Sequence, residues 1–408
     1  MLLTRRGRWP QTPCMRLLTF STLFPNAEQP NHGVFVENRL RHLVATGAAR
    51  ATVLAPVPYF PSSAALFGTW SRYARVPRSE SRHGLSIHHP RYLVIPKFGM
   101  NFAPALLYRA SLSAARRLHA AERFDLIDAH YVYPDGVAAV RLGAALGLPV
   151  VITARGSDVT QLPDFPAPRR MIRDAVTRAA GLIGVSAALR QRLIELGADP
   201  AKTVTLRNGI DTRMFHPVDR AAARAALGVS GTVLISVGGL IPRKRHHLTI
   251  GAMRHLPDAT LLIVGDGPER AALQMQIDSL GLSARVRLLG PQPHADLPRF
   301  YGAADASVLA SSREGWANVL LESMACGTPV IASDIPGNPE VVQAAEAGLI
   351  VRENTAEGIA EAARSLFAAL PDRTATRAYA EGFGWDETSE GQLALFRRIL
   401  ARSSGASG

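Results

Sequence analysis

Short apolar segments alternate with helical patterns along nearly the whole chain, and this alternation restricts the fold more than any other feature. Apolar runs such as RLLTF (16–20), VVITA (150–154) and TVLISV (232–237) belong to such repeats. Strands that are apolar on both faces and are connected by helices form parallel sheets covered by helices on both sides. The sequence therefore predicts an α/β protein with Rossmann-like, doubly wound sheets, whose ligands gather at the carboxyl ends of the strands.

The length of the chain predicts two domains. At 408 residues, with 47% hydrophobic and 19% charged residues, the chain is globular but too long for one ordinary domain. The segment TLRNGIDTRMFHP (205–217) separates two runs of strand–helix alternation, and 208–231 is the expected hinge. We therefore expect one domain over 15–207 and a second over 208–385, followed by an amphipathic helix at 386–401.

Both ends of the chain are expected to lie outside these domains. Residues 1–14 carry positive charge without an apolar segment after it, which predicts a disordered leader rather than a signal peptide. Met15 is an alternative start, and the Gly/Ser-rich residues 402–408 predict a disordered tail. The only cysteines are Cys14 and Cys326, so we expect no structural disulfide and a reducing compartment.

The net charge of +13 is unevenly distributed. Before the expected hinge there are 27 Lys and Arg against 12 Asp and Glu, a net charge of +15, whereas the remainder has 19 against 21, a net charge of −2. A helix predicted over 103–124 repeats arginine at Arg109, Arg116 and Arg123, and an aromatic, basic segment spans 70–78. The N-terminal half is expected to face an anionic partner such as a membrane surface, although a core-packed helix with a solvated arginine face fits the same pattern. No nucleic-acid recognition motif is present, so nucleic acid is not an expected partner.

Many of the candidate site residues lie in one stretch, SSREGWANVLLESMACGTPVIASDIPG (311–337). Glu314 lies in a turn, and from Asn318 the sequence predicts a helix that carries Glu322 about one turn from its start and ends at Gly327. Backbone amides at a helix N-terminus bind anions and polar oxygens. Two carboxylates beside a row of such amides favour a polyhydroxylated, phosphorylated ligand.

Each carboxylate also has a plainer interpretation. Glu314 suits the positive end of a helix dipole, and Glu322 suits a solvated helix surface. Glu322, however, stands in the mostly apolar run VLLESMACGTPV, and a buried carboxylate needs a partner. This placement favours the ligand interpretation.

The same stretch resembles the signature of glycosyltransferase family 4, the retaining nucleotide-sugar transferases, EG-x-x-x-V-L-L-E-[AS]-M-A-x-G-x-P-V-[IV]-A, at nearly every position. The resemblance implies the GT-B fold, in which two Rossmann-like domains face each other across a cleft and a C-terminal helix crosses back to the N-terminal domain. It also implies that Glu314 contacts the donor sugar and that Glu322 contacts the nucleotide ribose. The residues matching those whose amides bind sugar hydroxyls in the family are Gly315, Trp316, Ala317 and Asn318. Alanine stands at 317 where many members have proline.

The basic cluster Arg243, Lys244 and Arg245 is the candidate site for the donor diphosphate. Cations at a helix start oppose the helix dipole unless an anion sits there. The resemblance implies a clamp of the form G-R-L-x-x-x-K, in which Lys244 matches the lysine but Gly239 stands at the arginine position, so Arg243 or Arg245 is expected to substitute. The chain has no Asp-x-Asp, no zinc-like Cys/His spacing and no G-x-G-x-x-G, so no metal and no cofactor are expected.

Other positions match the family and are predicted to line the site. Gly33 matches the glycine of its first loop, near the donor phosphates, and His130 matches its N-domain histidine, near the reacting sugar. His130, Arg155 and Asp158 all stand at predicted strand ends. Two further segments match the family's donor loop and its backbone contact to the base: Gly265, Asp266, Gly267, Leu289 and Gly290. Plain glycine turns and a structural histidine explain the same residues.

These features predict a metal-independent, retaining hexosyltransferase with His130, Glu314 and Lys244 as candidate catalytic residues. The opening STLFPNAEQPNHGVF resembles that of members that build bacterial surface polysaccharides. In such enzymes the N-terminal domain holds the glycan or lipid-linked acceptor and the C-terminal domain holds the nucleotide sugar. The two cysteines and the basic N-terminal half predict a cytoplasmic protein on the inner face of the cell membrane. The resemblance implies a front-face mechanism in which the leaving phosphate takes the acceptor proton.

Two other classes fit the same sequence. The absence of the arginine at 239 is compatible with a catalytically silent GT-B binding or scaffold subunit. The fold is also shared by sugar-nucleotide epimerases and by phosphorylases, which use a lysine to hold pyridoxal phosphate, and this chain has three lysines.

Overall fold

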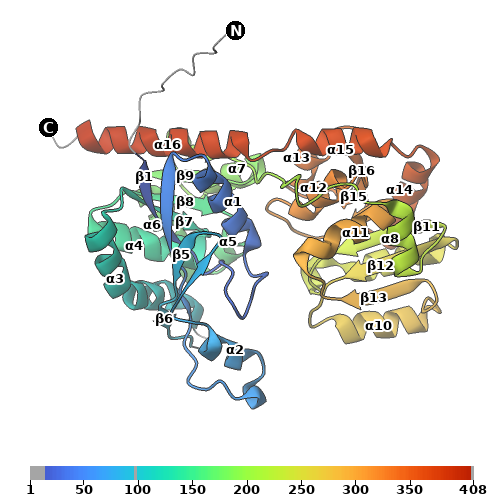
Figure 1. The fold of residues 1–408 in the computed structure, drawn as a ribbon, viewed down its shortest axis with the longest axis horizontal. Coiled ribbons are helices and arrows are strands. Elements are labelled where there is room, and N and C mark those ends of the chain that lie inside the picture. Colours follow the sequence, from blue (N-terminus) through green and yellow to red (C-terminus); the bar gives the residue numbers. More distant parts are fainter. Residues whose placement is uncertain (1–13, 96–98, 406–408) are drawn as a thin grey trace, which may run out of the picture.

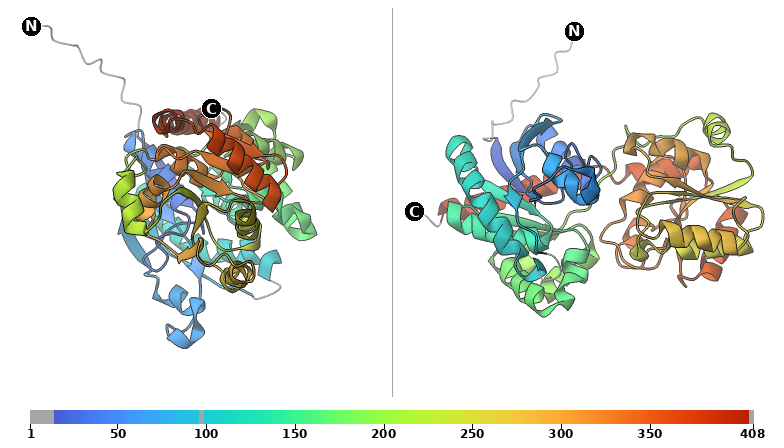
Figure 2. Two further views of the ribbon diagram at one scale, coloured as in Figure 1. Left: turned by 90° about the vertical axis from the view of Figure 1, so that its right-hand side faces the viewer. Right: turned by 90° about the horizontal axis from the view of Figure 1, so that it is seen from below.

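The computed structural model describes residues 14–95 and 99–405. Within them the chain forms two Rossmann-like domains, and the C-terminal helix α16 (Asp386–Gly405) returns to the N-terminal domain (Figure 1). Figure 2 shows the two domains side by side, each with helices packed on its sheet. The predicted α/β architecture of two Rossmann-like domains with a crossing C-terminal helix is confirmed.

The N-terminal domain contains an eight-stranded sheet in the order β10-β9-β8-β7-β1-β2-β5-β4. Its pairings are parallel except the one between β4 and β5. The strand order reverses between β1 and β7, and doubly wound sheets bind their ligands at the carboxyl ends of strands at such a reversal. The strands are β1 (Met15–Phe20), β2 (Ala49–Leu54), β4 (Ser79–Arg82), β5 (Leu85–His88), β7 (Leu126–His130), β8 (Val150–Ala154), β9 (Gly181–Gly184) and β10 (Thr203–Thr205), with a separate pair β3 (Val57–Pro58) and β6 (Arg91–Tyr92).

Helices cover both faces of this sheet. The strand residues that face them are fully buried, as in Leu126–His130 and Val150–Ala154, which explains why these segments read as continuous apolar runs. The helices are α1 (Val34–Ala45), α2 (Thr69–Arg75), α3 (Ala103–Glu122), α4 (Val137–Leu146), α5 (Ser157–Thr160), α6 (Pro166–Arg178) and α7 (Ala187–Glu195).

The C-terminal domain contains a six-stranded parallel sheet in the order β13-β12-β11-β14-β15-β16. Here the order reverses between β11 and β14, and the loops after these strands carry the candidate site. The strands are β11 (Thr232–Val237), β12 (Ala259–Val264), β13 (Val286–Gly290), β14 (Ala306–Leu309), β15 (Val330–Ser333) and β16 (Gly348–Val351). The helices are α8 (Arg220–Leu227), α9 (His246–Ala252), α10 (Arg270–Ser279), α11 (Leu297–Ala303), α12 (Asn318–Ala325), α13 (Asn338–Val341), α14 (Ala356–Ala368) and α15 (Arg373–Glu381).

Helix α16 is held on the N-terminal domain by a buried apolar face and by polar contacts, among them those of Gln392. Leu393 and Phe396 pack in a cluster with Val36 and other residues of that domain. Within it Gln392 accepts a hydrogen bond from Arg39 Nε at 2.8 Å and donates one to an Asp128 carboxylate oxygen at 3.0 Å. The amide thus joins three elements that are distant in sequence and satisfies a buried charge.

Two predicted boundaries differ from the structure. The C-terminal helix continues from the expected end at 401 to Gly405, because a nucleated helix gains one hydrogen bond per added residue and the tail has no proline to stop it. The segment 208–231, predicted as a hinge, contains the helix α8, whose first turn is capped by the Asp219 side chain. Of the predicted leader and tail, 1–13 and 406–408 lie outside the described residues.

The described part of the chain has neither a helix that could span a membrane nor a disulfide. No helix within residues 14–95 and 99–405 is both long enough and apolar enough to cross a bilayer. Cys14 is free and exposed, and Cys326 is free and buried at the end of α12.

Candidate active site

A cleft of about 850 Å³ lies between the two domains. Its walls come from the loops that follow β1, β7 and β8 in the N-terminal domain and β11, β12 and β14 in the C-terminal domain. A volume of this size suits a nucleotide-sized ligand. Both strand-order reversals therefore open onto the same cavity.

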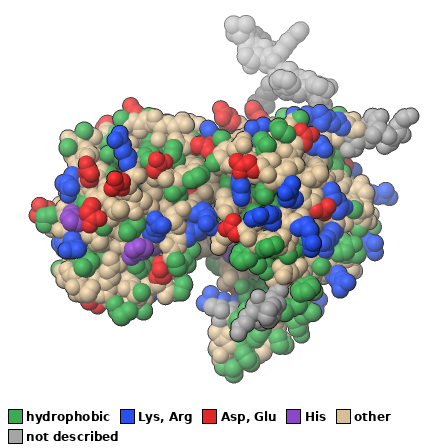
Figure 3. Space-filling view, turned by 180° about the vertical axis from the view of Figure 1, so that it is seen from behind, with side chains coloured by type: hydrophobic (Ala, Val, Ile, Leu, Met, Phe, Trp, Pro, Cys, Tyr) green, Lys and Arg blue, Asp and Glu red, His purple; other side chains and the backbone are tan. Residues whose placement is uncertain are grey.

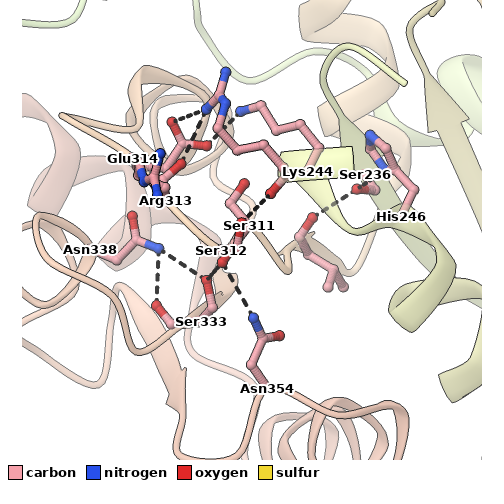
Figure 4. A network of polar contacts seen from close by, with 12 residues as sticks. Ser236, Lys244, His246, Ser311, Ser312, Arg313, Glu314, Ser333, Asn338 and Asn354 are labelled. Atoms are coloured by element: carbon pink, nitrogen blue, oxygen red, sulfur yellow. Dashed lines mark hydrogen bonds and ion pairs between the residues drawn. The ribbon is translucent and has the colours of Figure 1, made fainter. Parts of the chain in front are cut away.

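The centre of the C-terminal wall is an ion pair around Glu314, in the loop after β14. Lys244 Nζ donates to one carboxylate oxygen of Glu314 at 2.7 Å, and Arg243 Nη1 donates to the other at 3.2 Å (Figure 4). Burial alone would raise the pKa of the Glu314 carboxyl, but the charges of Lys244 and Arg243 outweigh it and hold the pKa below the ordinary glutamate value. Two cations and one carboxylate leave this cluster with a net charge of +1, which favours an anionic ligand.

Buried hydrogen bonds fix the loop that presents Glu314. Ser333 Oγ donates to the carbonyl of Ser311 at 2.7 Å, and Asn354 Nδ2 donates to the same carbonyl at 3.3 Å (Figure 4). The backbone amide of Ser312 donates to the carbonyl of Arg243 at 2.8 Å, which ties the Glu314 loop to the loop that carries the cations. The carboxylate and its partners are therefore held by backbone contacts as well as by charge.

Lys244 reaches the cleft because a glycine leaves room for its side chain. A Cβ atom on Gly238 would lie 3.3 Å from Lys244 Cε. Beneath this lysine, burial and then the lysine charge lower the pKa of His246 to about 4, so its ring is neutral at neutral pH. The ring nitrogen Nδ1 lies 3.1 Å from the Ser236 hydroxyl (Figure 4).

Free backbone amides adjoin the Glu314 carboxylate. Among the described residues, the amides of Gly315, Trp316 and Ala317 donate to no protein acceptor, and all three residues line the cleft. They precede α12, whose positive end faces the same cavity. The predicted row of amides is therefore present, with Asn318 as the exception because its amide donates to the Trp316 carbonyl at 3.1 Å.

Glu322 lies at the opposite end of the site, in the second turn of α12. Its carboxylate accepts hydrogen bonds from Tyr301 at 3.2 Å and contacts His294 Nε2 at 3.3 Å. Burial alone would lower the pKa of His294, but the hydrogen bond and charge of Glu322, together with Asp211, raise it above the ordinary histidine value. The buried carboxylate thus has the partners that its apolar sequence context required, and Glu322 and His294 both line the cleft.

Arg155 forms the facing wall, at the end of β8. Its guanidinium donates to Asn208 Oδ1 at 3.0 Å and to His130 Nδ1 at 2.7 Å, and it stacks over Phe35 at 5.3 Å from the ring centre. Asn208 Nδ2 in turn donates to Asn318 Oδ1 at 3.2 Å. A chain of hydrogen bonds therefore connects the N-terminal domain to the start of α12.

His130 does not reach the cleft wall. It is fully buried behind Arg155, and its Nε2 lies 3.3 Å from an Asp128 carboxylate oxygen. Burial is the largest reason why its pKa is lowered to about 4, and the Asp128 charge only partly opposes it. The structure gives His130 the position of a support for Arg155, and its contact with a sugar stays a prediction.

Asp158 has a structural role at the end of the same sheet. Its carboxylate accepts hydrogen bonds from the backbone amides of Val132, Arg155 and Gly156 at 2.7 to 3.1 Å. It therefore fixes the loops after β7 and β8 relative to each other. It does not line the cleft.

Several predicted glycines shape the wall from behind it. A Cβ on Gly33 would lie 2.4 Å from the Leu23 backbone, and one on Gly267 would lie 2.3 Å from the Leu240 carbonyl oxygen. Their neighbours Asn31, Val34, Gly265 and Asp266 line the cleft, whereas Gly33 and Gly267 themselves do not. Leu289 and Gly290 are likewise set back, and the wall there is made by Pro291 and Gln292.

Only two of the three residues in the basic cluster line the cleft. Arg243 and Lys244 line the cleft from a 3-10 turn (Pro242–Lys244) that precedes α9, rather than from the first turn of a helix as predicted. Arg245 takes a left-handed conformation with φ of 50° at the start of α9 and does not line the cleft. A side chain at Gly239 would meet only the Asp266 carbonyl oxygen, at 3.8 Å, so packing does not explain the glycine there.

Among the cleft residues that sequence reasoning missed and the tertiary structure brings in are Tyr131, Asn208, Gln292 and His294. Asn208 was visible only as part of the expected connection between domains. His294 lies in a loop without a pattern, and only its contact with Glu322 marks it. Tyr131 follows the strand ending in His130 and has φ of 83°, which is rare for a residue with a side chain.

Two family models match the chain. One, described as Glycosyltransferase Family 4, matches residues 34–214, and the other, described as Glycosyl transferases group 1, matches residues 219–383. D-inositol 3-phosphate glycosyltransferases of Mycobacterium tuberculosis and Mycobacterium bovis are 31% identical over 316 residues. These alignments cover 72% of this chain and 65% of the relatives' own length.

Solved structures share the fold over nearly the whole chain. Sucrose-phosphate synthase from Thermosynechococcus elongatus superposes with a TM-score of 0.78 at 21% identity, covering 96% of this chain and all of the other. HepE from Anabaena, in complex with UDP and glucose, has a TM-score of 0.71 at 21% identity and covers 94% of this chain and 98% of the other. WaaG, a glycosyltransferase involved in lipopolysaccharide biosynthesis, has a TM-score of 0.66 at 15% identity, covering 94% and 99%.

The fold is that of the GT-B class. The chain belongs to glycosyltransferase family 4. The fold class and the family predicted from the motif around Glu314 are therefore both confirmed.

The contact between Glu322 and His294 can be tested through the pKa of the histidine. In Glu322→Gln, burial is no longer opposed by the carboxylate charge, so we expect the pKa of His294 to fall below the ordinary histidine value. NMR titration of the imidazole resonances measures the pKa of His294, and the variant His294→Gln identifies which resonance belongs to it. A raised pKa in the wild type means that protonated His294 stabilises the fold at acidic pH, and that this contribution is lost as pH rises through the folded pKa. An unchanged pKa in Glu322→Gln would contradict the assigned contact.

Proposed function

We propose that the protein is a retaining glycosyltransferase that moves a hexose from a nucleoside-diphosphate sugar to a glycan acceptor carried on a lipid. One observation carries the proposal. The Glu314 carboxylate, the cations Lys244 and Arg243 and the free amides of 315–317 converge on one interdomain cleft. This set complements a sugar, whose hydroxyls need acceptors and donors, joined to a diphosphate, which needs cations.

The charges of the site suit the bond that this reaction breaks. When the bond between the sugar C1 and the phosphate oxygen breaks, negative charge grows on the leaving diphosphate. In this proposal Lys244, Arg243 and the amides before α12, which all line the cleft, stabilise that charge. In the proposed front-face reaction the acceptor oxygen bonds to C1 on the face that the phosphate leaves, and its proton passes to that phosphate. Arg243 takes the place of the arginine that is absent at Gly239.

The same cations are the basis for proposing a reaction without a metal. In the part of the chain that the structure describes, no group of three or more His, Cys, Asp or Glu residues is placed to hold a metal ion. Two protein cations beside the expected diphosphate supply the charge that a metal would otherwise supply.

We assign the lipid-linked acceptor and the inner membrane face from the charge of the N-terminal domain. Arg109, Arg116 and Arg123 are all exposed along α3 and at its end. Figure 3 shows many Lys and Arg side chains on the N-terminal domain. Anionic lipid headgroups attract such a surface over about a Debye length, roughly 8–10 Å in physiological salt.

A silent binding subunit is the second candidate, and Gly239 is the observation that favours it. Without the arginine usual at this position, the cleft would bind a nucleotide sugar without transferring it. A panel of UDP-, GDP-, ADP- and dTDP-sugars separates the two candidates, with thermal shift reporting binding and released nucleoside diphosphate reporting turnover. Binding without release would establish the silent alternative.

Glu314→Gln should lower turnover with the matching donor by about 10²–10³-fold, the effect of losing one preorganised polar contact in a transition state. Binding of the nucleoside diphosphate should stay at wild-type strength or become stronger, because the change removes a negative charge beside Lys244 and Arg243. Steady-state kinetics and calorimetry measure the two effects. The exposed Glu361→Gln is the matched control, and wild-type turnover in Glu314→Gln would remove Glu314 from the catalytic set.

Lys244→Ala should weaken binding of the nucleoside diphosphate by about 10–100-fold, since a hydrogen bond to a charged group contributes about 1.5–3 kcal/mol. Binding of the bare nucleoside should change far less. Calorimetry with both ligands tests this, and Lys202→Ala, outside the cleft wall, controls for loss of a lysine. Equal losses for both ligands would place Lys244 away from the phosphates.

Turnover should persist when divalent metals are removed. We expect the same rate of donor turnover in excess EDTA as in buffer with Mg²⁺, because protein cations neutralise the leaving group. The control is to add Mg²⁺ back to the EDTA-treated enzyme. A loss of activity in EDTA that Mg²⁺ restores would contradict the metal-independent reaction.

A further inference from the structure

A small extension projects from the N-terminal domain and carries exposed apolar side chains at its end. It comprises α2 with the loops around it and residues 93–95 after β6, and Figure 1 shows α2 reaching beyond the body of the domain. We define the apolar tip as Leu66, Phe67, Trp70, Leu93, Val94 and Ile95. Figure 3 shows hydrophobic side chains gathered on this projection.

These apolar side chains are largely exposed to solvent. Leu66 is 81% exposed, Leu93 is 60% exposed and Trp70 is 41% exposed. Single exposed apolar residues are common, but a contiguous group on one projection marks a binding surface. Together they offer a surface that water solvates poorly.

Aromatic contacts give the tip a defined shape. The Phe60 ring lies 5.3 Å from the Phe67 ring and 6.0 Å from the Trp70 ring, and Trp70 lies 5.7 Å from Tyr73. The rings pack on one another and still leave Phe67 and Trp70 exposed. Tryptophan and tyrosine are the residues that favour the boundary between lipid headgroups and acyl chains.

The charges around the tip identify its partner as anionic. Residues 56–95 contain five arginines and a single acidic residue, Glu80. Arg75 pairs with Glu28 and Arg82 pairs with Glu37. Arg72 and Arg78 are exposed, and neither they nor Arg91 form an ion pair with any residue in the described part of the chain, so three positive charges of residues 56–95 have no acidic partner.

We propose that the apolar tip inserts into the interface of an anionic bilayer while Arg72 and Arg78 bind lipid phosphates. The inference rests on the proposed transfer to a lipid-linked acceptor for its purpose, because insertion would hold the N-terminal domain where such an acceptor lies. Insertion differs from the attraction exerted by Arg109, Arg116 and Arg123. Binding through buried apolar side chains persists at high salt, whereas salt screens the attraction between charges. A second copy of the chain is a poorer occupant, because two tips would bring like charges together.

Trp70 reports insertion directly. Of the other tryptophans, Trp316 and Trp385 are buried, and Trp9→Phe removes the one outside the described residues. In the Trp9→Phe background, vesicles of phosphatidylglycerol with brominated acyl chains should quench the Trp70 emission and shift it to shorter wavelength. The further change Trp70→Phe should abolish both effects. Trp70 emission unaffected by brominated lipid would overturn the proposal.

Co-sedimentation separates insertion from charge attraction. Leu66→Ser with Leu93→Ser should lower the fraction bound to anionic vesicles in 0.5 M NaCl at least tenfold. Leu370→Ser, an exposed leucine of the C-terminal domain, should leave it unchanged. Arg109/Arg116/Arg123→Ala should reduce binding mainly at low salt. Equal binding by the tip variant and the wild type at high salt would overturn insertion, and so would a dimer in light scattering that the tip variant abolishes.

Turnover of the donor in detergent-free buffer keeps this test independent of the proposed function. The tip variants should release nucleoside diphosphate from the donor at the wild-type rate, because no tip residue lines the cleft. Quenching of Trp70 without turnover of any donor would leave the tip proposal standing and reject the proposed function. Turnover without quenching would reject the tip proposal and leave the proposed function standing.

Discussion

The close contact between the backbones of Arg155–Gly156 and Gly315 sets the geometry on which the site depends. A Cβ on Gly315 would lie 2.0 Å from the Arg155 carbonyl oxygen, and one on Gly156 would lie 3.2 Å from the Gly315 nitrogen. Glycine at both positions lets the loops after β8 and β14 touch across the domain boundary. Because Glu314 and the free amides flank Gly315, this contact also places the proposed sugar site directly against the N-terminal domain.

Polar contacts across the boundary reinforce that arrangement. Asn208 links Arg155 to Asn318 through its side-chain amide. Further away, the Glu340 carboxylate accepts hydrogen bonds from the amides of Ala187 and Ala188 at the start of α7, which stabilises that helix end. These hydrogen bonds join the two domains beside the cleft, in addition to an apolar cluster that contains buried residues of both domains.

The candidate site residues divide into those that line the cleft and those that hold them in place. Glu314, Lys244 and Arg243 face the cleft as one charged cluster, whereas His130 and Asp158 support Arg155 and its loop from within the domain. A histidine behind an arginine fixes the orientation of the guanidinium. The sequence predicted His130 near the reacting sugar, with a structural histidine as the alternative; its buried position behind Arg155 fits the structural role, and its contact with a sugar stays a prediction.

The sequence by itself determined the two Rossmann-like domains, the helix α12 with its preceding amides, and the two carboxylates Glu314 and Glu322, because apolar periodicity and glycine placement act locally. It could not determine the partners of those carboxylates. Lys244 is 70 residues from Glu314, and His294 is 28 residues from Glu322, so only the meeting of strand ends and loops brings them together. The tertiary structure likewise decided that His130 is covered by Arg155 and that Leu66 and Trp70 remain exposed, because burial depends on which segments pack above a residue and not on the residue itself.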